Sequence, residues 1–320
     1  MRSEGYSPDA ADLILASWRG STQRAYATYI SKWKQFALSQ NFDPDLPSPP
    51  RVANFLAHLF QEGASYSAIN TARSALSAYL PLVNNCTVGN HPSVCKLVKG
   101  VFEKRPALPK YADTWDVKDV LKYLKLCVPL EKLSLKEITL KTCTLLSLVT
   151  GQRGQAIHSL ACSDLRFSDS KCIIQYSAKH KTTKPGFHTA PCELLVYSDP
   201  DLCPVRTLQH YLQRTKPLRK GHQLFNSYEK PHGPVTRQTF ARWVKTVLEL
   251  SGIEQYAPHS ARAASCSAAN NKGLPLENIL KAAGWASSRT FARFYKRDLS
   301  ADTQNFGQSV LDSFVCSNKS

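Results

Sequence analysis

Two arginines and one histidine occur in short motifs that suit phosphate binding. Arg153 follows a Thr-Gly turn in "TGQRGQAIHSL", where an apolar helical pattern ends. His259 and Arg262 are three residues apart in "PHSARAASCSAA", so a helix would place them on one face. Guanidinium groups bind phosphate through paired hydrogen bonds, and helix starts attract anions. Taken singly, these motifs also fit a surface arginine, or a buried capping histidine beside a salt-bridged arginine.

A tyrosine near the end of the chain is a candidate nucleophile. Tyr295 lies in "AGWASSRTFARFYKRD", where Phe291 and Phe294 also fit an aromatic core. A free tyrosine has a pKa of about 10, so its attack on a phosphodiester requires stabilisation of the developing negative charge. Two arginines supply fixed donors for that charge, and no metal is then required. We expect Phe291 and Phe294 to anchor the helix and Tyr295 to face the phosphate.

A basic segment between two β-rich runs supplies candidate proton donors. The stretch "SAKHKTTKPG" contains Lys179, Lys181 and Lys184. Hairpin tips are often basic for solubility alone, but a mobile lysine brought onto a phosphate can protonate a leaving alkoxide. The three lysines are therefore candidates for this role and for phosphate contact.

The charge of the chain points to a polyanionic partner. Its 320 residues include 41 Lys and Arg against 24 Asp and Glu, a net charge of +17. Residues 1–105 carry 11 basic and 7 acidic side chains, whereas residues 106–320 carry 30 and 17. Because Lys and Arg hold phosphates, a folded basic surface favours a nucleic acid ligand over a merely soluble basic protein.

Signals for membrane insertion and secretion are missing from the sequence. No apolar run approaches the length of a membrane span, and the N-terminus is acidic where a signal peptide is basic. Ten cysteines show neither CxxC pairs nor regular spacing, which is typical of reduced thiols. We expect an intracellular protein in a reducing compartment, with no membrane association.

Acidic residues show no pattern suited to a metal ion. The nearest candidate group is Asp113, Asp116 and Asp119 in "ADTWDVKD". It lies at the start of an expected helix, where acids interact favourably with the helix dipole. We therefore expect no metal and no other cofactor.

The first part of the chain predicts a helical domain. Amphipathic periodicity begins at Ser21 or Thr22, which we expect to cap a helix that reaches beyond Phe36. Further helical patterns cover residues 52–60, 66–80 and 94–102. We expect a tail, a compact four-helix domain and a proline-containing linker over residues 1–20, 21–104 and 105–113 respectively.

The second part predicts a mixed domain over residues 114–300. Helices are expected over residues 117–126, 135–148, 205–215, 236–250, 260–271 and 276–283. The β-rich runs 172–176 and 188–195 flank the basic segment and predict a small antiparallel sheet with a long hairpin. The fold class is thus α+β, mainly α. A tail over residues 301–320 contains a short helical pattern, which could dock on its own core or on a neighbouring molecule.

The ordered set of Arg, Lys, His-x-x-Arg, Trp and Tyr resembles the tyrosine recombinase, or phage integrase, family. The local matches are "TGQR", "KTTKPG", "HSARAAS" and "AGWASSRTFARFY", and coverage runs from about residue 21 to about residue 298. Within the family, the chain most resembles recombinases of the eukaryotic DIRS-like, Ngaro and Crypton mobile elements. The resemblance implies a SAM-like four-helix core-binding domain followed by a tyrosine-recombinase catalytic domain.

This resemblance implies a role for each matching residue. Arg153 and Arg262 would hold the non-bridging oxygens of the scissile phosphate, and His259 would assist proton transfer. Trp285 stands where many relatives have a second histidine. Tyr295 would attack phosphorus and form a 3′-phosphotyrosyl bond.

The remaining expected contacts are basic side chains. Lys181, or Lys179 as the alternative, would protonate the leaving 5′ oxygen. The further side chains expected to bind DNA are Arg24, Lys32, Lys34, Arg73, Lys179 and Lys184.

Two features depart from the family pattern. The third residue after Arg153 is acidic in many members and is Ala156 here, so support for His259 must come from elsewhere. Trp285 precedes Tyr295 by ten residues, one more than in many bacterial and phage relatives, although this spacing suits the eukaryotic mobile-element branch.

The resemblance implies a site-specific recombinase or integrase of a mobile element that acts on double-stranded DNA. It also implies a homotetramer on DNA, a nuclear location and no small-molecule substrate. A type IB topoisomerase-like enzyme would use the same residues without pairing two duplexes. A domesticated DNA-binding protein would keep the DNA clamp and lack strand transfer, although retention of the matching residues argues against it.

Overall fold

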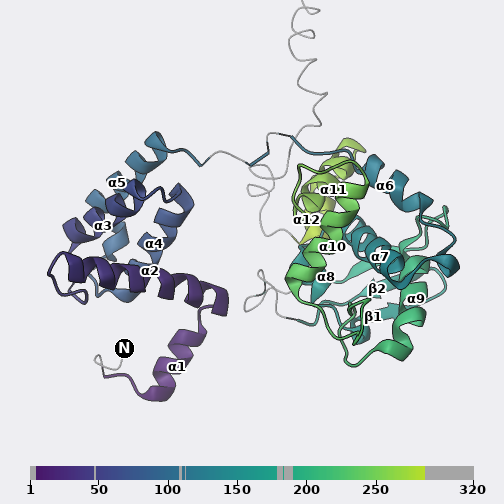
Figure 1. Ribbon diagram of the computed structural model, residues 1–320, viewed down its shortest axis with the longest axis horizontal. Coiled ribbons are helices and arrows are strands. Elements are labelled where there is room, and N and C mark those ends of the chain that lie inside the picture. The colour runs from purple at the N-terminus through teal and green to yellow at the C-terminus, as the bar shows by residue number, and fades with distance from the viewer. Residues whose placement is uncertain are drawn as a thin grey trace, which may run out of the picture. The chain divides into compact units, whose positions relative to one another are not determined.

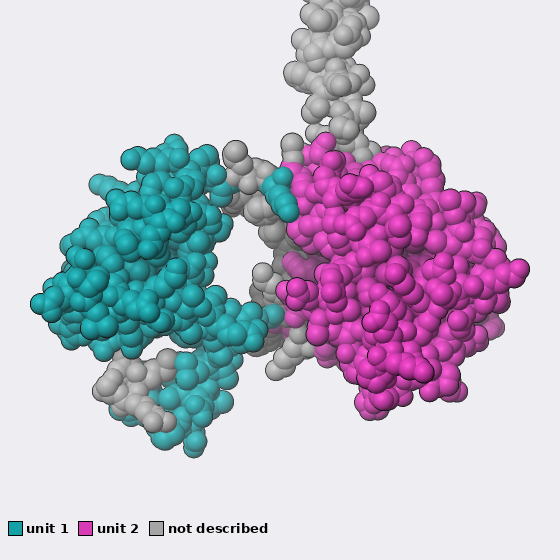
Figure 2. All heavy atoms as spheres, in the orientation of Figure 1, with its two compact units in different colours: residues 1–110 teal, residues 111–320 magenta. Residues whose placement is uncertain are grey.

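The structure, a computed structural model, describes residues 5–46, 48–107, 110–111, 113–178, 183 and 190–284 (Figure 1). The chain divides into two compact units, Met1–Lys110 and Tyr111–Ser320, which have different colours in Figure 2. The division falls within the segment for which the sequence predicts a linker. Each unit has its own hydrophobic core.

Unit 1 is built from helices around an aromatic core. Its helices are α1 (Pro8–Ala16), α2 (Gly20–Ser39), α3 (Pro49–Gln61), α4 (Tyr66–Tyr79) and α5 (Pro92–Lys104). Trp33 and Phe55 are buried at the centre, and the ring of Phe36 packs against both. Helices α2 to α5 coincide with the four helical patterns of the sequence, because each buries the apolar stripe that predicts it.

The N-terminal segment differs from the expectation in two ways. The stretch predicted as a tail contains α1, because the hydroxyl of Ser7 accepts a hydrogen bond from the N–H of Ala10 and a proline occupies the first turn. Helix α2 begins at Gly20, so the predicted cap at Ser21 or Thr22 is wrong.

Unit 2 arranges shorter helices around α7. Its helices are α6 (Val117–Leu126), α7 (Leu135–Thr150), α8 (Gly154–His158), α9 (Pro204–Thr215), α10 (Arg237–Leu250), α11 (Ser260–Asn271) and α12 (Leu276–Ala283). Helix α7 is buried along nearly its whole length, and α9, α10 and α11 pack against it (Figure 1). The sequence predicts all of these helices to within two residues at each end, except the one-turn α8. Nowhere in the described part of the chain is a helix long and apolar enough to cross a membrane.

The small antiparallel sheet is present, with one strand more than the sequence predicts. The strands β1 (Leu165–Phe167), β2 (Lys171–Ile174) and β3 (Cys192–Leu195) pair in that order. Cys172 of β2 faces Leu194 of β3, and both side chains are buried. Strand β1 is too short to display an alternating pattern, so the sequence does not reveal it. Both predicted strands are shorter than expected, since β2 ends before residue 175 and residues 190 and 191 lie outside β3.

Candidate active site

Three of the predicted site residues line one cavity in unit 2. Arg153, His259 and Arg262 come from two distant parts of the sequence and border a hollow of about 390 Å³. Its walls come from α7, α8, α10 and α11 and the turns beside them. Among the described residues that line it, none is acidic. A cavity with several cationic side chains and no carboxylate on its wall favours an anion.

The end of α7 places Arg153. Helix α7 ends at Thr150 and is followed by Gly151, whose φ of 56° is left-handed and favours glycine. A Cβ at this position would lie 3.5 Å from the Cβ of Ala283 and 3.7 Å from the Sγ of Cys266, so α11 and α12 close around the turn. Arg153 follows as the capping residue of α8, and its half-buried side chain borders the cavity.

Arg262 is oriented by the same turn. Its side chain is buried, and its Nη1 donates a hydrogen bond of 2.9 Å to the carbonyl oxygen of Gly151. That carbonyl belongs to the C-terminal end of α7, where the helix dipole favours a cation. The bond orients the guanidinium before any ligand binds, so Arg262 is a preorganised group for an anion.

His259 precedes α11 but does not cap it with its side chain. The residue is exposed, and its imidazole makes no capping hydrogen bond. The alternative of a buried capping histidine is therefore wrong. An exposed imidazole on the wall of the cavity is able to exchange protons with a ligand.

A third arginine on the wall is missed by the sequence analysis. Arg237 is the first residue of α10 and follows its capping residue, Thr236. It is exposed at the positive end of the helix, and Phe240 of the same helix forms an apolar part of the wall. Its signal in the sequence is a basic residue after a capping threonine, which is too common to mark a site.

Gln152 connects the cavity to α12. Its buried side chain lines the cavity, and its Nε2 donates a hydrogen bond of 2.7 Å to the carbonyl oxygen of Ala282. Gly284 ends α12 with a left-handed φ of 65°, and a Cβ there would lie 3.2 Å from the Nε2 of Gln152. The end of α12 is thus held beside the cavity, directly before the segment that carries Trp285 and Tyr295 in the sequence.

The other predicted catalytic residues lie outside the described residues. These are Lys181 with its alternative Lys179, Trp285 and Tyr295, and the same holds for Lys184 and the C-terminal tail. Their roles stay predictions. The last described residue before the basic lysines is Ala178, and the last before Trp285 is Gly284.

The basic side chains of unit 1 that are predicted to contact DNA do not share one face. Helix α2 carries the exposed side chains of Arg24, Lys32 and Lys34, and helix α4 carries the half-buried side chain of Arg73. Lys32 borders a groove between α2 and α3, whereas the Nζ of Lys34 lies 5.3 Å from the ring centre of Tyr79 in α4. A hydrogen bond with Tyr79 raises the pKa of Lys34. The two lysines therefore lie on different sides of α2.

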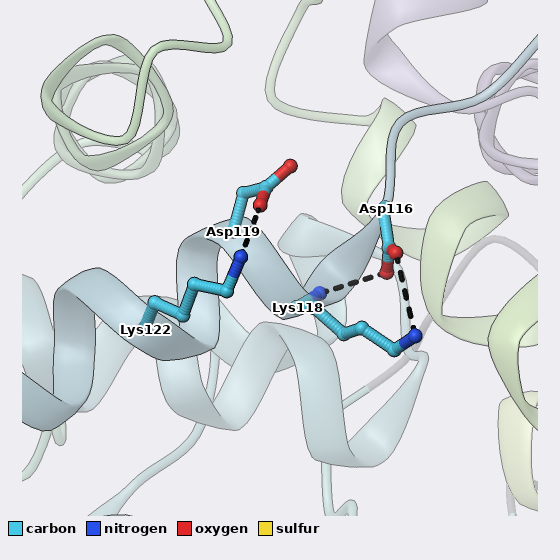
Figure 3. A network of polar contacts seen from close by, with 4 residues as sticks. All are labelled: Asp116, Lys118, Asp119 and Lys122. Carbon is cyan, nitrogen blue, oxygen red and sulfur yellow. Dashed lines mark hydrogen bonds and ion pairs between the residues drawn. The ribbon is translucent and has the colours of Figure 1, made fainter.

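Two of the three acidic residues that the sequence assigns to the start of a helix, Asp116 and Asp119, stabilise α6, whereas Asp113 accepts a hydrogen bond from Tyr256. Asp116 caps α6 by accepting a hydrogen bond of 2.9 Å from the N–H of Lys118 (Figure 3). In the next turn the Nζ of Lys122 lies 3.2 Å from the Oδ1 of Asp119 (Figure 3). Within the described ranges, no group of three or more His, Cys, Asp or Glu side chains is arranged to hold a metal ion.

Comparison with known proteins assigns a family to most of unit 2. Residues 116–301 match the sequence profile of the phage integrase family. No protein of curated function matches the sequence significantly.

Solved structures share the fold at low sequence identity. The XerH site-specific recombinase, in a post-cleavage complex with palindromic difH substrate, gives a TM-score of 0.61 at 15% identity over 90% of this chain and 79% of that chain. A lambda integrase dimer bound to a COC′ core site gives 0.56 at 19% identity over 92% and 95%. The Tn1549 transposon integrase in complex with transposon right end DNA gives 0.55 at 15% identity over 81% and 84%. These likenesses concern the fold and confirm the predicted class, a mainly helical chain with a small antiparallel sheet.

Proposed function

The chain belongs to the phage integrase family, and on that premise we propose that it is a site-specific DNA recombinase that works through a 3′-phosphotyrosyl intermediate. The observation that carries the proposal is the cavity shared by Arg153, His259 and Arg262. Fixed cationic donors in a partly enclosed site stabilise the charge that develops on a phosphodiester during displacement. The net charge of +17 further supports double-stranded DNA as the partner.

In this proposal the two arginines bind the scissile phosphate from different elements. Arg262 is held by its bond to the end of α7, and Arg153 stands at the start of α8, so their donors approach the non-bridging oxygens from two elements. His259 assists proton transfer at the same phosphate. Trp285 packs beside the phosphate.

The covalent step exchanges one phosphoester bond for another. The hydroxyl of Tyr295 gives up its proton, with His259 assisting the transfer, as its oxygen attacks phosphorus. The bond from phosphorus to the 5′ oxygen breaks as Lys181 or Lys179 supplies a proton to that oxygen. The 3′ phosphate stays on the tyrosine. Attack by a 5′ hydroxyl then reverses the reaction, so rejoining requires no ATP.

The wider context follows from this chemistry. Recombination needs two cuts on each of two duplexes, which makes a tetramer on DNA the expected assembly. We place the enzyme in a mobile element of the DIRS-like, Ngaro or Crypton type and in the nucleus, where its substrate lies. In the basic segment 214–220, Arg214 and Arg219 donate hydrogen bonds to backbone carbonyls. Nuclear location is therefore inferred from the substrate rather than from this segment as an import signal.

Covalent capture on nicked duplexes tests the proposal. The full chain is incubated with a library of nicked duplexes that carry a randomised central segment, so that the released short strand diffuses away and rejoining is blocked. We expect a protein–DNA adduct that survives denaturing electrophoresis, with a defined sequence enriched in the bound strand. Tyr295→Phe abolishes the adduct, whereas the matched control Tyr228→Phe retains it.

Each alternative gives a different result in this assay. An adduct from Tyr295→Phe as strong as that from the unchanged chain would show that the nucleophile is another residue. Tight DNA binding without an adduct would favour a domesticated DNA-binding protein. Relaxation of supercoiled plasmid by single protomers, without strand exchange between duplexes, would favour a topoisomerase.

A further inference from the structure

The loop that carries His259 is fastened by the chain segment that leads into unit 2. Helix α5 ends at Lys104 and α6 begins at Val117, and the segment between them enters unit 2 at Tyr111. Side chains of this segment bond to the loop over residues 256–260. All of these contacts lie within unit 2.

Two of the contacts involve a pair of tyrosines. The hydroxyl of Tyr111 accepts a hydrogen bond of 2.8 Å from the backbone N–H of Ala257. The hydroxyl of Tyr256 donates a hydrogen bond of 2.7 Å to the Oδ1 of Asp113. The rings of Tyr111 and Tyr256 also pack together, with their centres 4.8 Å apart. These contacts therefore attach the loop to the segment at Tyr256 and Ala257, shortly before His259.

A third contact lies directly after His259. The indole Nε1 of Trp115 donates a hydrogen bond of 2.8 Å to the Oγ of Ser260, the first residue of α11. Both side chains are buried, at 6% and 5% exposure. A hydrogen bond away from water is harder to replace than an exposed one, so it restrains the start of α11 firmly.

One position in the element that carries Arg153 offers His259 no hydrogen-bonding side chain. The third residue after that arginine is Ala156, which is buried in α8 and whose methyl side chain donates and accepts no hydrogen bond. The histidine itself is exposed, and its side chain does not cap α11. The contacts of Tyr256, Ala257 and Ser260 restrain the loop on both sides of His259.

We propose that Tyr111, Asp113 and Trp115 are positioning residues that set His259 relative to Arg262 in the cavity. They act through the loop and not on the phosphate. Their effect on catalysis rests on the proposed function, whereas their effect on the loop is a property of the free protein. The two effects are therefore measured separately.

Hydrogen exchange of the free, full chain tests the fastening. Tyr256→Phe removes only the hydroxyl that bonds Asp113, and Asp113→Ala removes its acceptor. We expect amide exchange in the peptide 256–262 to speed up about fivefold in both variants, as expected for one lost hydrogen bond. Asp113→Asn keeps an acceptor oxygen and restores slow exchange.

A matched control separates this effect from the general loss of a hydroxyl. Tyr228→Phe alters a half-buried tyrosine whose ring packs on Trp243, 5.3 Å away, and leaves exchange of the loop unchanged. If Asp113→Ala does not fold, Trp115→Phe serves in its place, because it keeps an aromatic ring and loses only the N–H donor and part of the ring system.

A double-mutant cycle tests the catalytic part. At saturating nicked duplex, Tyr256→Phe lowers the rate of adduct formation about fivefold or more and leaves the Kd for DNA unchanged. In a His259→Ala background the same substitution has no further effect, because the residue that it positions is already gone. A merely structural role would give the same loss in both backgrounds.

The outcomes are distinct. Unchanged exchange in Tyr256→Phe and Asp113→Ala overturns the fastening itself. Faster exchange with an equal rate loss in both backgrounds overturns the positioning of His259. Faster exchange in a protein that forms no adduct on any duplex leaves the fastening in place and overturns the proposed function together with the catalytic part of the inference.

Discussion

Arg262 has both a structural role in unit 2 and a role in the proposed chemistry. Its guanidinium bonds the carbonyl oxygen of Gly151, and its side chain also lines the cavity. A flat, forked cation can bond a helix end and a phosphate oxygen at once, whereas an ammonium is a compact charge without that geometry. Substitutions at this residue are therefore expected to affect stability and strand transfer together.

Arg262→Lys keeps the charge and loses the fork. We expect the rate of adduct formation to fall about 100-fold or more, the size of effect seen when one fixed donor to a developing oxyanion is lost. The free energy of unfolding falls by about 1–3 kcal/mol, because the Gly151 carbonyl loses a buried partner. Single-turnover cleavage and urea denaturation measure the two effects. Arg242→Lys, at an exposed arginine of α10 that does not line the cavity, is the control and stays near the unchanged chain in both.

Arg237 is expected to bind DNA without forming part of the covalent chemistry. Arg237→Ala weakens duplex binding to a similar degree for all sequences and lowers the slope of log Kobs against log salt by about 1, as expected for one lost phosphate contact. Fluorescence anisotropy over a series of KCl concentrations measures the slope. An unchanged slope would place Arg237 away from the phosphates, and Arg242→Ala again provides the comparison on the same helix.

At the scale of the elements, the two ends of α7 have different tasks. Its C-terminal end forms the turn that places Arg153 and Arg262. Its N-terminal end carries a capping box, in which Ser134 accepts from the N–H of Glu137 at 3.2 Å and donates its own N–H to the Glu137 carboxylate at 2.7 Å. The helix that frames the cavity is thus anchored at the end remote from it.

The capping box makes stability depend on pH. Hydrogen bonds from Ser134 lower the pKa of Glu137 below its ordinary value. The stabilisation is complete above the unfolded pKa of about 4.3 and is lost as pH falls through the lowered folded pKa. Ser134→Ala lowers the free energy of unfolding by about 1 kcal/mol at pH 7. This difference from the unchanged chain becomes smaller as the pH falls and Glu137 is protonated. Urea denaturation between pH 7 and pH 3 measures it, with Glu137→Gln as a variant in which this pH dependence is missing.

The end of α12 depends on a glycine. Gly284→Ala places a Cβ at a residue with left-handed φ, about 3.2 Å from the Nε2 of Gln152. We expect the left-handed backbone to lower the free energy of unfolding by about 1–2 kcal/mol and the close contact to lower it further. Gly252→Ala is the matched control, because its φ of 77° is also left-handed and nothing lies near the added carbon. Thermal unfolding of both variants measures the difference. Equal losses would mean that the contact with Gln152 is unimportant.

The whole molecule consists of two compact units. Unit 1 has its own core around Trp33, and unit 2 has its own around α7. The proposed reaction on two duplexes requires more than one copy of the chain, since each copy contains one candidate tyrosine at the matching position.

The assembly on DNA is therefore a test of the proposal. Mass photometry of the full chain with duplexes enriched by covalent capture is expected to show complexes of four protomers and two duplexes. These complexes dissociate as salt rises, because phosphate contacts release counterions. One protomer on each duplex under all conditions would contradict recombination between duplexes.

Local patterns in the sequence determined most of the elements. Helices α6, α11 and α12 have the predicted bounds, because helical periodicity, prolines and capping residues act over a few neighbouring positions. Strand β1 and the single turn α8 were missed, since such short elements show little periodicity. Helix α1 was missed because its large apolar residues, Leu13, Ile14 and Leu15, are consecutive and not at helical spacing. The start of α2 was misplaced because the chain offers several residues in succession that could precede a helix.

The candidate site also depends partly on local sequence motifs and partly on tertiary packing. Residue types and motif order in the sequence were enough to select Arg153, His259 and Arg262 as candidates for phosphate binding. Only the tertiary structure brings them to one cavity, because that depends on how α7, α8, α10 and α11 pack. Arg237 lines the same cavity as Arg153, and Asp113 bonds the loop that carries His259, although these residues are far apart in the chain. No local sequence pattern encodes such long-range contacts. Spacing along the chain decides which face of a helix a side chain occupies, and packing decides what that face meets.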